Sequence, residues 1–417
     1  MRVLILGSGA REHAITWKYS KSNRISGLFI APGNAGTAEL GENLPDVNIL
    51  NPQSVLKACQ SNKIDLVFVG PEQPLERGVV DLLIEKSVPV IGPPKKSAQL
   101  ETSKRFSKNF MLKYNIPTAQ AEEFSSYSKY ESYIKNISGM VVIKKNGLAS
   151  GKGVLESDDK KELLDFGKKV LKDDSLLVEE YLTGFEISIF ALSDGKNYIL
   201  LPHCSDFKKA GENDEGPNTG GMGSICPVPL INSGLMTRIE EEIIGPTFRG
   251  LNEENLNYKG VVYFGLMITD KGPKLLEYNV RFGDPEAQVL LPLIESDFGN
   301  LSDAIINQRL FDFPLRISDN SALGVVVAAE GYPGNYKKGV PVKPIPVFPE
   351  KTAYVFHAST TFDKENRVLT GGGRCFTVVG LGQNLLNANV RAYEAVARVQ
   401  FEGGWYRGDI GKKFFME

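Results

Sequence analysis

The sequence predicts a multidomain protein of mixed α/β and α+β class, with a doubly wound parallel sheet at its N-terminal end. Over the first hundred residues, short apolar runs alternate with helical segments, which is typical of buried parallel strands covered by helices on both faces. Beyond them, helix and strand patterns are mixed and end in a small α+β region. A chain of 417 residues is long enough for two to four such domains.

The N-terminal alternation defines a first domain over residues 1–100. Its expected strands are the apolar runs RVLILG, GLFIA, IDLVFVG and VPVIG. The segments between them, REHAITWKYSK, NPQSVLKACQS and PLERGVVDLLIEK, read as helices, and the second has Pro52 in its first turn. In such a sheet, the loops that follow the strands form a ligand crevice.

Two α+β units and a C-terminal domain are expected after the first domain. A connecting helix over 101–120 leads to a unit over 121–193, with the strands MVVIKK, SLLVEEYL and FEISIFAL and a helix. The second unit, 194–320, contains a helix interrupted at Pro246 and the paired strands YKGVVYFGLMIT and PKLLEYNV. Residues 321–417 form the last, small α+β domain.

Composition and charge argue against several classes of protein. A formal net charge of −2 provides no global field for nucleic acid or anionic membrane, and no apolar run approaches the roughly 20 residues that span a bilayer. The four cysteines and three histidines are scattered, which excludes a disulfide framework, a zinc ribbon and a His-rich metal site. Because no charged leader precedes the first strand, we expect a cytoplasmic protein. The net charge and the lack of a long apolar run predict neither nucleic-acid nor membrane partners.

The first strand runs into the motif GSGARE, in which Gly7 and Gly9 allow a tight turn. The N-terminus of the next helix then offers N–H groups to an anion. A dinucleotide fingerprint would need a third glycine where Glu12 stands, and an acidic residue about 20 positions later, which is missing. The motif therefore favours another phosphate-bearing small molecule, with a purely structural turn as the alternative.

The motif KNGLASGKG is similar to a phosphate-binding P-loop but fails its spacing. Three residues, not four, separate Gly147 from Gly151, and Gly153 stands where a hydroxyl should hold magnesium. We interpret the segment as a Gly-rich flap that closes over phosphates, with Lys144 and Lys152 adding positive charge. A plain hairpin turn is the alternative.

Two further stretches suit nucleotide or anion binding. The strand LLVEEYLTGFEIS could read an adenine with its backbone and a ribose with Glu186, although acids on an edge strand also serve solubility. The polar loop over 205–227 is long, and such loops inside domains are usually functional or disordered. Its segment NTGGMG offers backbone N–H groups to an anion or carboxylate.

The stretch KLLEYNVRFGDPEAQ begins as an apolar strand and ends in a charged turn. Glu277 and Asn279 are two residues apart, so they point to one face, and Arg281 follows by the same count. A carboxylate and an amide oxygen suit Mg²⁺, while the arginine suits a transferring phosphoryl group or a substrate carboxylate. A surface salt-bridge cluster is the alternative, but the strand is too apolar to be exposed. Asp284 and Glu286 are expected to brace the turn.

Taken together, these motifs resemble the ATP-grasp superfamily, and within it the phosphoribosylamine–glycine ligases (glycinamide ribonucleotide synthetases). RFGDPEAQ is similar to the signature octapeptide of that family. Other landmarks follow in the family order along nearly the whole chain: APGNAG, VGPE, IGPP, GLASGKGV, GPNTGGMG, GYPGNY and YRGDIG. The resemblance implies an ATP-grasp core made of the two α+β units, the monofunctional form, and a monomer.

The same resemblance implies an enzyme of purine (IMP) biosynthesis that acts at its second step. Such a ligase joins glycine to 5-phosphoribosylamine with ATP, through a glycyl phosphate intermediate, and releases ADP and phosphate. Its cofactors are ATP and Mg²⁺ (or Mn²⁺), and its partners are these small-molecule substrates.

Residue roles carry over from the resemblance by position. The implied ATP-binding residues are Lys104, Lys144, Gly151, Lys152, Gly153, Glu179, Glu180, Tyr181, Leu182 and Glu186. The implied substrate-binding residues are Gly9, Glu12, Asn34, Pro71, Glu72, Asp206, Asn218, Thr219, Gly220, Gly221, Met222 and Arg281. Glu277 and Asn279 are the implied metal ligands, and Arg281 and Lys144 the implied catalytic residues.

Two positions depart from the family pattern. Asn146 stands where an acidic residue commonly precedes the flap glycine. Phe207 and Lys209 follow Asp206 where His and Arg are common, and lysine keeps the charge but lacks the guanidinium fork.

Three other kinds of function are alternatives to the ligase. Other ATP-grasp enzymes, such as a biotin-dependent carboxylase subunit or a formate-using purine enzyme, lack the combination of GPNTGGMG and RFGDPEAQ. A nicotinamide-dependent oxidoreductase would need the third glycine of the fingerprint. A noncatalytic nucleotide-binding module would not need the face formed by Glu277, Asn279 and Arg281.

Overall fold

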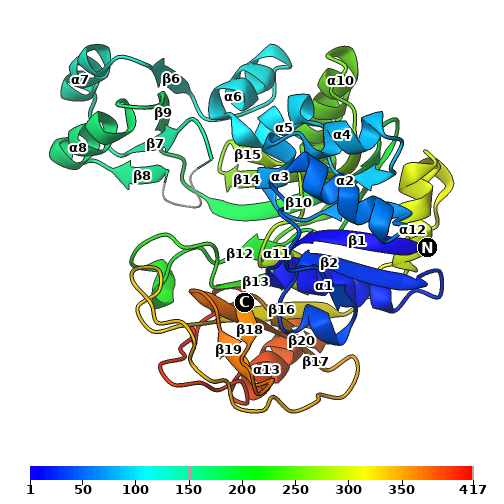
Figure 1. Cartoon of the computed structure of the whole chain (residues 1–417). Helices are drawn as coiled ribbons and strands as arrows, with labels where there is room; N and C mark the ends of the chain where they lie inside the picture. The colour runs from blue at the N-terminus through cyan, green and yellow to red at the C-terminus, as the bar shows by residue number, and fades with distance from the viewer. Residues whose placement is uncertain (149–152, 416–417) are drawn as a thin grey trace.

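The N-terminal domain confirms the predicted doubly wound parallel sheet. The computed structural model describes residues 1–148 and 153–415 (Figure 1). Five parallel strands run in the order β3-β2-β1-β4-β5, and the central strand β1 is almost completely buried because helices cover both faces. The strands are β1 (Arg2–Gly7), β2 (Gly27–Pro32), β3 (Glu42–Asn43), β4 (Leu66–Val69) and β5 (Val90–Ile91).

The helices of this region follow their sequence patterns, except that one expected helix divides in two and another is shorter than predicted. They are α1 (Ala10–Ser20), α2 (Pro52–Ser61), α3 (Glu72–Glu76), α4 (Val79–Glu85), α5 (Lys95–Thr102) and α6 (Lys104–Lys113). The expected helix PLERGVVDLLIEK splits into α3 and α4 because Gly78 takes a left-handed conformation, with φ of 75°. The predicted connecting helix over 101–120 is replaced by α6, which starts after the capping residue Ser103 and ends before Pro117.

A small antiparallel sheet, which we call the lid, stands apart from the rest of the molecule in Figure 1. Its strands, in the order β6-β9-β7-β8, are β6 (Ala121–Phe124), β7 (Val141–Lys145), β8 (Val154–Ser157) and β9 (Leu176–Glu180). Helices α7 (Tyr127–Asn136) and α8 (Lys160–Val170) pack on it around a separate core that includes Tyr130 and Ile143.

The central sheet has the order β11-β10-β14-β15. Its strands are β10 (Phe185–Asp194), β11 (Tyr198–Leu200), β14 (Lys259–Thr269) and β15 (Gly272–Asn279). Residues up to 193 were expected in the lid unit, but β10 pairs with β14 along its whole length and therefore belongs to the central sheet. The reason is that β10 is buried on both faces, whereas the lid offers too little core to cover it.

Several helices come from the same part of the chain as β14 and β15. They are α9 (Ser233–Ile239), the π-helix η3 (Glu240–Ile244), α10 (Gly245–Glu253), α11 (Glu286–Leu290) and α12 (Phe298–Ile306). The predicted interruption at Pro246 takes the form of the π-helix, which absorbs the missing backbone N–H before α10 begins. Short 3₁₀ turns lie at Thr37–Glu39, Glu212–Asp214, Leu291–Leu293, Leu310–Asp312 and Lys412–Phe414.

The C-terminal sheet includes short strands from both ends of the long polar loop. In the order β12-β13-β16-β20-β17, its strands are β12 (Ser205–Asp206), β13 (Gly223–Cys226), β16 (Ser321–Ala328), β20 (Arg374–Gly382) and β17 (Ala353–His357). The hairpin of β18 (Thr360–Phe362) and β19 (Val368–Thr370) and the helix α13 (Leu385–Val396) complete the unit. The loop therefore starts and ends inside a sheet, which limits how far it can move. Within the described residues, no helix is long and apolar enough to cross a membrane.

Candidate active site

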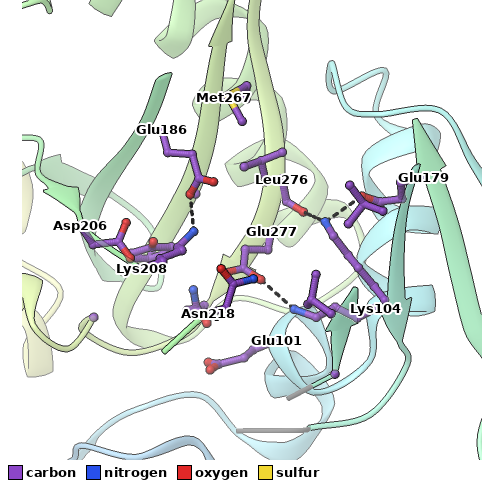
Figure 2. Close-up of a pocket in the computed structure, with 18 of the residues that line it drawn as sticks. Glu101, Lys104, Glu179, Glu186, Asp206, Lys208, Asn218, Met267, Leu276 and Glu277 are labelled. Carbon is purple, nitrogen blue, oxygen red and sulfur yellow. Dashed lines mark hydrogen bonds and ion pairs between the residues drawn. The ribbon is translucent and has the colours of Figure 1, made fainter. Parts of the chain in front are cut away.

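A cavity of about 390 Å³ lies between the lid and the central sheet (Figure 2). It brings together predicted residues from five parts of the chain. Those that border it are Glu72, Lys104, Lys144, Gly153, Glu179, Glu180, Tyr181, Leu182, Glu186, Asp206, Asn218, Thr219, Gly220, Glu277, Asn279 and Arg281. Gly9, Glu12, Asn34, Pro71, Gly221 and Met222 do not border it. Gly151 and Lys152 of the flap lie outside the described residues.

One part of the cavity is apolar. Ala119 and Val142 border it from the lid side, and Met267 and Leu276 from strands β14 and β15. The backbone after β9, at Tyr181 and Leu182, lies at the same place. An apolar slot between two sheets, next to backbone groups that follow the end of β9, suits a flat heteroaromatic ring such as adenine.

Three of the four lysines that border the cavity are each paired with a glutamate. Lys104 Nζ lies 2.9 Å from Glu277 Oε2, and Lys144 Nζ lies 2.7 Å from Glu179 Oε2. Lys208 pairs with Glu186, which was expected to hold a ribose (Figure 2). No sequence motif marks Lys208, which lies between the two departing positions Phe207 and Lys209. Three ammonium groups held at fixed positions suit a polyphosphate.

Glu179 borders the cavity and pairs with two lysines. The side chain is 4% exposed, and its second oxygen, Oε1, lies 2.9 Å from Lys108 Nζ. Burial acts to raise the pKa of Glu179, but Lys144 and Lys108 outweigh it and the pKa falls below its ordinary value. Lys144 also donates to the carbonyl of Leu276 at 3.2 Å, where a β-bulge turns that carbonyl out of the β14–β15 ladder.

Glu277 and Asn279 both border the cavity from the end of β15, as their spacing predicts. Burial acts to raise the pKa of Glu277, but Lys104, Lys208 and Lys144 together hold it well below its usual range, so the carboxylate is charged. Asn279 Oδ1 accepts a hydrogen bond from Arg281 Nη2 at 3.1 Å.

These two oxygen donors fit Mg²⁺, which prefers carboxylate and amide oxygens and retains phosphate and water ligands. Within the described residues, no group of three or more His, Cys, Asp or Glu side chains is arranged to hold a metal. The site therefore fits a metal that arrives with the phosphates of a nucleotide better than a metal bound by protein alone.

Arg281 is fixed by two acids from the N-terminal region. Its Nη2 lies 2.6 Å from Glu101 Oε1, and its Nε lies 3.7 Å from Glu72 Oε2. Glu101, on α5, is 4% exposed and accepts a second hydrogen bond from Val280 N at 2.9 Å. Burial raises the pKa of Glu101 even though Arg281 acts to lower it. Nothing in the local sequence pattern of α5 marks Glu101 as a site residue, so it is not among the predicted residues.

We predict that Glu101→Gln lowers kcat about 10- to 100-fold while changing the KM for ATP by less than about 3-fold. Arg281 would lose its closest anchor, but the nucleotide contacts of the lysines would stay. Steady-state kinetics at saturating substrates measures both constants. Glu85→Gln, at an exposed acid on α4, is the matched control and should match the parent protein. A rise in KM for ATP with kcat unchanged would contradict this positioning role.

The residues predicted from the first domain mostly hydrogen-bond within the protein. Gly9 N donates to Glu12 Oε2 at 2.7 Å, and Arg11 Nε lies 2.5 Å from Glu12 Oε1. Asn34 Nδ2 donates to the carbonyls of Ser8, at 2.9 Å, and His357, at 2.8 Å. Pro71 caps α3, and only Glu72 of this predicted set reaches the cavity. Their predicted contacts with substrate stay predictions.

The octapeptide turn packs directly against the long loop. Gly221 has φ of 110°, and a Cβ built there would lie 2.5 Å from Pro285 Cδ, so no larger residue fits. Asp284 accepts a hydrogen bond from Gln288 Nε2 at 2.9 Å, and Glu286 accepts one from Ser188 Oγ at 3.1 Å. Both acids border the cavity, and their internal hydrogen bonds brace the turn.

The two departures from the family pattern have structural counterparts. Asn146 accepts hydrogen bonds from Arg105 N, at 2.9 Å, and Ser103 Oγ, so it caps the helix that carries Lys104. Phe207 is buried in the core, and Lys209 lies 3.8 Å from Glu156 on β8 of the lid. Asp206 borders the cavity, and burial raises its pKa to about 7 although Lys208 acts to lower it.

Comparison with known proteins identifies the family. Three models described as phosphoribosylglycinamide synthetase match in succession: the N domain over residues 1–101, the ATP-grasp (A) domain over 102–287 and the C domain over 322–413. A phosphoribosylamine–glycine ligase of Caldanaerobacter subterraneus subsp. tengcongensis is 43% identical over 98% of this chain and 99% of its own.

Other similar proteins point to the same family. A trifunctional purine biosynthetic protein adenosine-3 of Gallus gallus is 41% identical, with 98% of this chain aligned to 42% of that protein. The crystal structure of a phosphoribosylamine–glycine ligase from Thermotoga maritima superposes with a TM-score of 0.85 at 37% identity, covering 99% of this chain and all of that one. The predicted ATP-grasp fold is thereby confirmed, and the chain belongs to the phosphoribosylglycinamide synthetase family of purine biosynthesis.

Proposed function

We propose that this chain is an ATP-dependent ligase that joins the carboxylate of glycine to the amine of 5-phosphoribosylamine. The products are glycinamide ribonucleotide, ADP and phosphate. The observation that carries the proposal is one cavity that combines three paired lysines, the Glu277–Asn279 oxygen pair and the anchored Arg281. Membership in the phosphoribosylglycinamide synthetase family selects the substrates.

The first step overcomes the poor reactivity of a carboxylate toward an amine. An oxygen of the glycine carboxylate attacks the γ-phosphorus of ATP, ADP leaves, and glycyl phosphate forms. This step needs mainly positioning and charge neutralisation. Lys104, Lys144 and Lys208 supply cations along the cavity, and Arg281 borders the same cavity, where its guanidinium would face the transferring phosphoryl group.

Glu277 and Asn279 would hold a divalent cation, Mg²⁺ or Mn²⁺, together with the ATP phosphates. The cation supplies further neutralisation of phosphate charge when bound. With a cation held there, Glu277 would give up its contact with Lys104, and that ammonium group would be available to a phosphate oxygen.

In the second step, the amine nitrogen attacks the carbonyl carbon of glycyl phosphate. The nitrogen loses a proton, the C–O bond to phosphate breaks, and the amide and inorganic phosphate result. Asp206 borders the cavity and the Asn218–Gly220 segment lies beside it, so both can contact the second substrate. We further propose that the protein acts as a cytoplasmic monomer.

The proposal predicts ADP release only when ATP, Mg²⁺, glycine and freshly generated phosphoribosylamine are all present. Phosphoribosylamine forms in the assay from ribose 5-phosphate and ammonia. A coupled ADP assay, with mass spectrometry of the product, measures the reaction. Omitting each component in turn provides the controls. ATP turnover that is independent of glycine, or no turnover with all components present, would reject the assignment.

A further inference from the structure

The predicted phosphoribosylamine pocket lacks a cation for the phosphate of its substrate. Its side chains from the first domain include two acids, Glu12 and Glu72, and no lysine or arginine. A phosphate ester is a dianion near neutral pH and is usually held by arginine, lysine or backbone N–H groups. Arg11 is adjacent, but its Nε pairs with Glu12 and its Nη1 donates to the carbonyl of Phe282 at 3.0 Å.

Arg374, on β20 of the C-terminal sheet, contacts the long loop and the octapeptide turn. Its Nη1 donates to the carbonyl oxygens of Gly220, at 2.7 Å, and Asp284, at 3.0 Å, and lies 3.2 Å from Asp284 Oδ1. One nitrogen therefore joins the long loop to the octapeptide turn. The guanidinium lies flat against Gly220, where a built Cβ would be 3.1 Å from Nη2.

The opposite edge of the same guanidinium remains available. Among residues 1–148 and 153–415, no acceptor is hydrogen-bonded to Arg374 Nε or Nη2, and the side chain is 23% exposed. Two parallel N–H donors on a planar group match two oxygens of a phosphate. Because Nη1 is locked by three carbonyl contacts, this edge is held in one orientation before any ligand binds.

Asp284 connects Arg374 to the turn at Gly9. Its Oδ2 lies 3.4 Å from the position of a Cβ built on Gly9. Burial acts to raise the pKa of Asp284, but Arg374 and Arg11 lower it on balance, so the carboxylate is charged. One side chain thus separates Arg374 from the start of α1, where the sequence predicts an anion site.

We propose that Arg374 binds the 5′-phosphate of the ribosylamine substrate through Nε and Nη2, while its Nη1 holds the loop. This inference rests on the proposed function, and it makes Arg374 the residue that selects a phosphorylated sugar. No family motif used in the sequence analysis includes this arginine, which follows the glycines of the stretch TGGGRC.

The test compares two amine substrates on Arg374→Gln. Ribose 5-phosphate with ammonia supplies the phosphorylated amine, and ribose with ammonia supplies the same amine without phosphate. We expect the parent protein to prefer the phosphorylated amine. In the variant, the KM for that amine should be about 10- to 100-fold higher. The kcat/KM for the unphosphorylated amine should fall much less, because that reaction loses only the contacts of Arg374 with the loop and the turn.

An equal loss for both amines would overturn the proposal and leave Arg374 with the loop contacts alone. Arg374→Lys keeps the charge without the fork, and should lose preference for the phosphorylated amine by an intermediate amount. If Arg374→Gln does not fold, Arg374→Lys still tests the proposal. Arg367→Gln, an exposed arginine paired with Asp363, is the matched control and should behave like the parent.

A second assay distinguishes failure of this proposal from failure of the proposed function. Hydroxylamine can replace the amine and trap glycyl phosphate as glycine hydroxamate, with no sugar present. The parent protein and Arg374→Gln should form hydroxamate at equal rates. If the parent forms none, the proposed function fails; if only the variant loses this activity, the phosphate-binding role fails.

Discussion

Replacing Glu277 with glutamine should lower kcat/KM about 100- to 1,000-fold while leaving the protein folded. The side chain keeps its shape but loses the charge that would hold a divalent cation, and it releases Lys104, Lys208 and Lys144 from their shared carboxylate. Lys104 loses its partner, and its ammonium group then repels those of Lys144 and Lys208, which keep Glu179 and Glu186. Steady-state kinetics across a range of Mg²⁺ concentrations measures the loss.

The metal dependence separates the two roles of Glu277. A residue that binds the metal should shift the Mg²⁺ concentration for half-maximal activity upward, beyond the change in kcat. Glu241→Gln, at an exposed acid of the π-helix, is the control and should leave that concentration unchanged. Parent-like activity of Glu277→Gln at low Mg²⁺ would remove Glu277 from the metal site.

Substitution of Arg281 should damage both catalysis and stability. Arg281→Gln should lower kcat about 1,000-fold by removing the guanidinium beside the phosphoryl group, and Arg281→Lys somewhat less because the charge remains. The glutamine variant also leaves the buried Glu101 without its nearest cation, 2.6 Å away in the parent. Breaking a buried pair in this way should cost about 3–5 kcal/mol in the free energy of unfolding near neutral pH.

The stability loss should depend on pH with a definite sign. Burial already raises the pKa of Glu101, and removing Arg281 raises it further, so the folded variant binds a proton more readily than the unfolded chain. Its stability relative to the parent should therefore fall as pH rises from about 5 to about 8. Denaturant unfolding at both pH values measures this. A loss that is equal at both values would be inconsistent with a buried, unpaired Glu101.

Several features could be predicted from local sequence. The alternation of apolar runs and helices gave the parallel N-terminal sheet because buried parallel strands are continuously apolar. The two-residue spacing of Glu277 and Asn279 placed both on the cavity side of β15, because strand side chains alternate between faces. Family motifs then identified the reaction. In each case the information lies within a few neighbouring residues.

Other features depended on pairings between distant parts of the chain. Strand β10 follows the lid in sequence but joins the central sheet, since only β14 offers it a partner along its full length. Lys104 and Glu277 are 173 residues apart, and Glu101 and Arg281 are 180 apart. Neither pair has a sequence signature, because an ion pair requires only that two side chains meet in space.

The sequence by itself therefore determined the fold class, the order of the units and the type of chemistry, through patterns that repeat every two to four residues. The tertiary structure decided which charges face one another: Lys208 against Glu186, Glu101 against Arg281, and Arg374 across the loop and the turn. Electrostatic interactions in a water-poor cavity act through distance and burial, and neither can be read from separation along the chain.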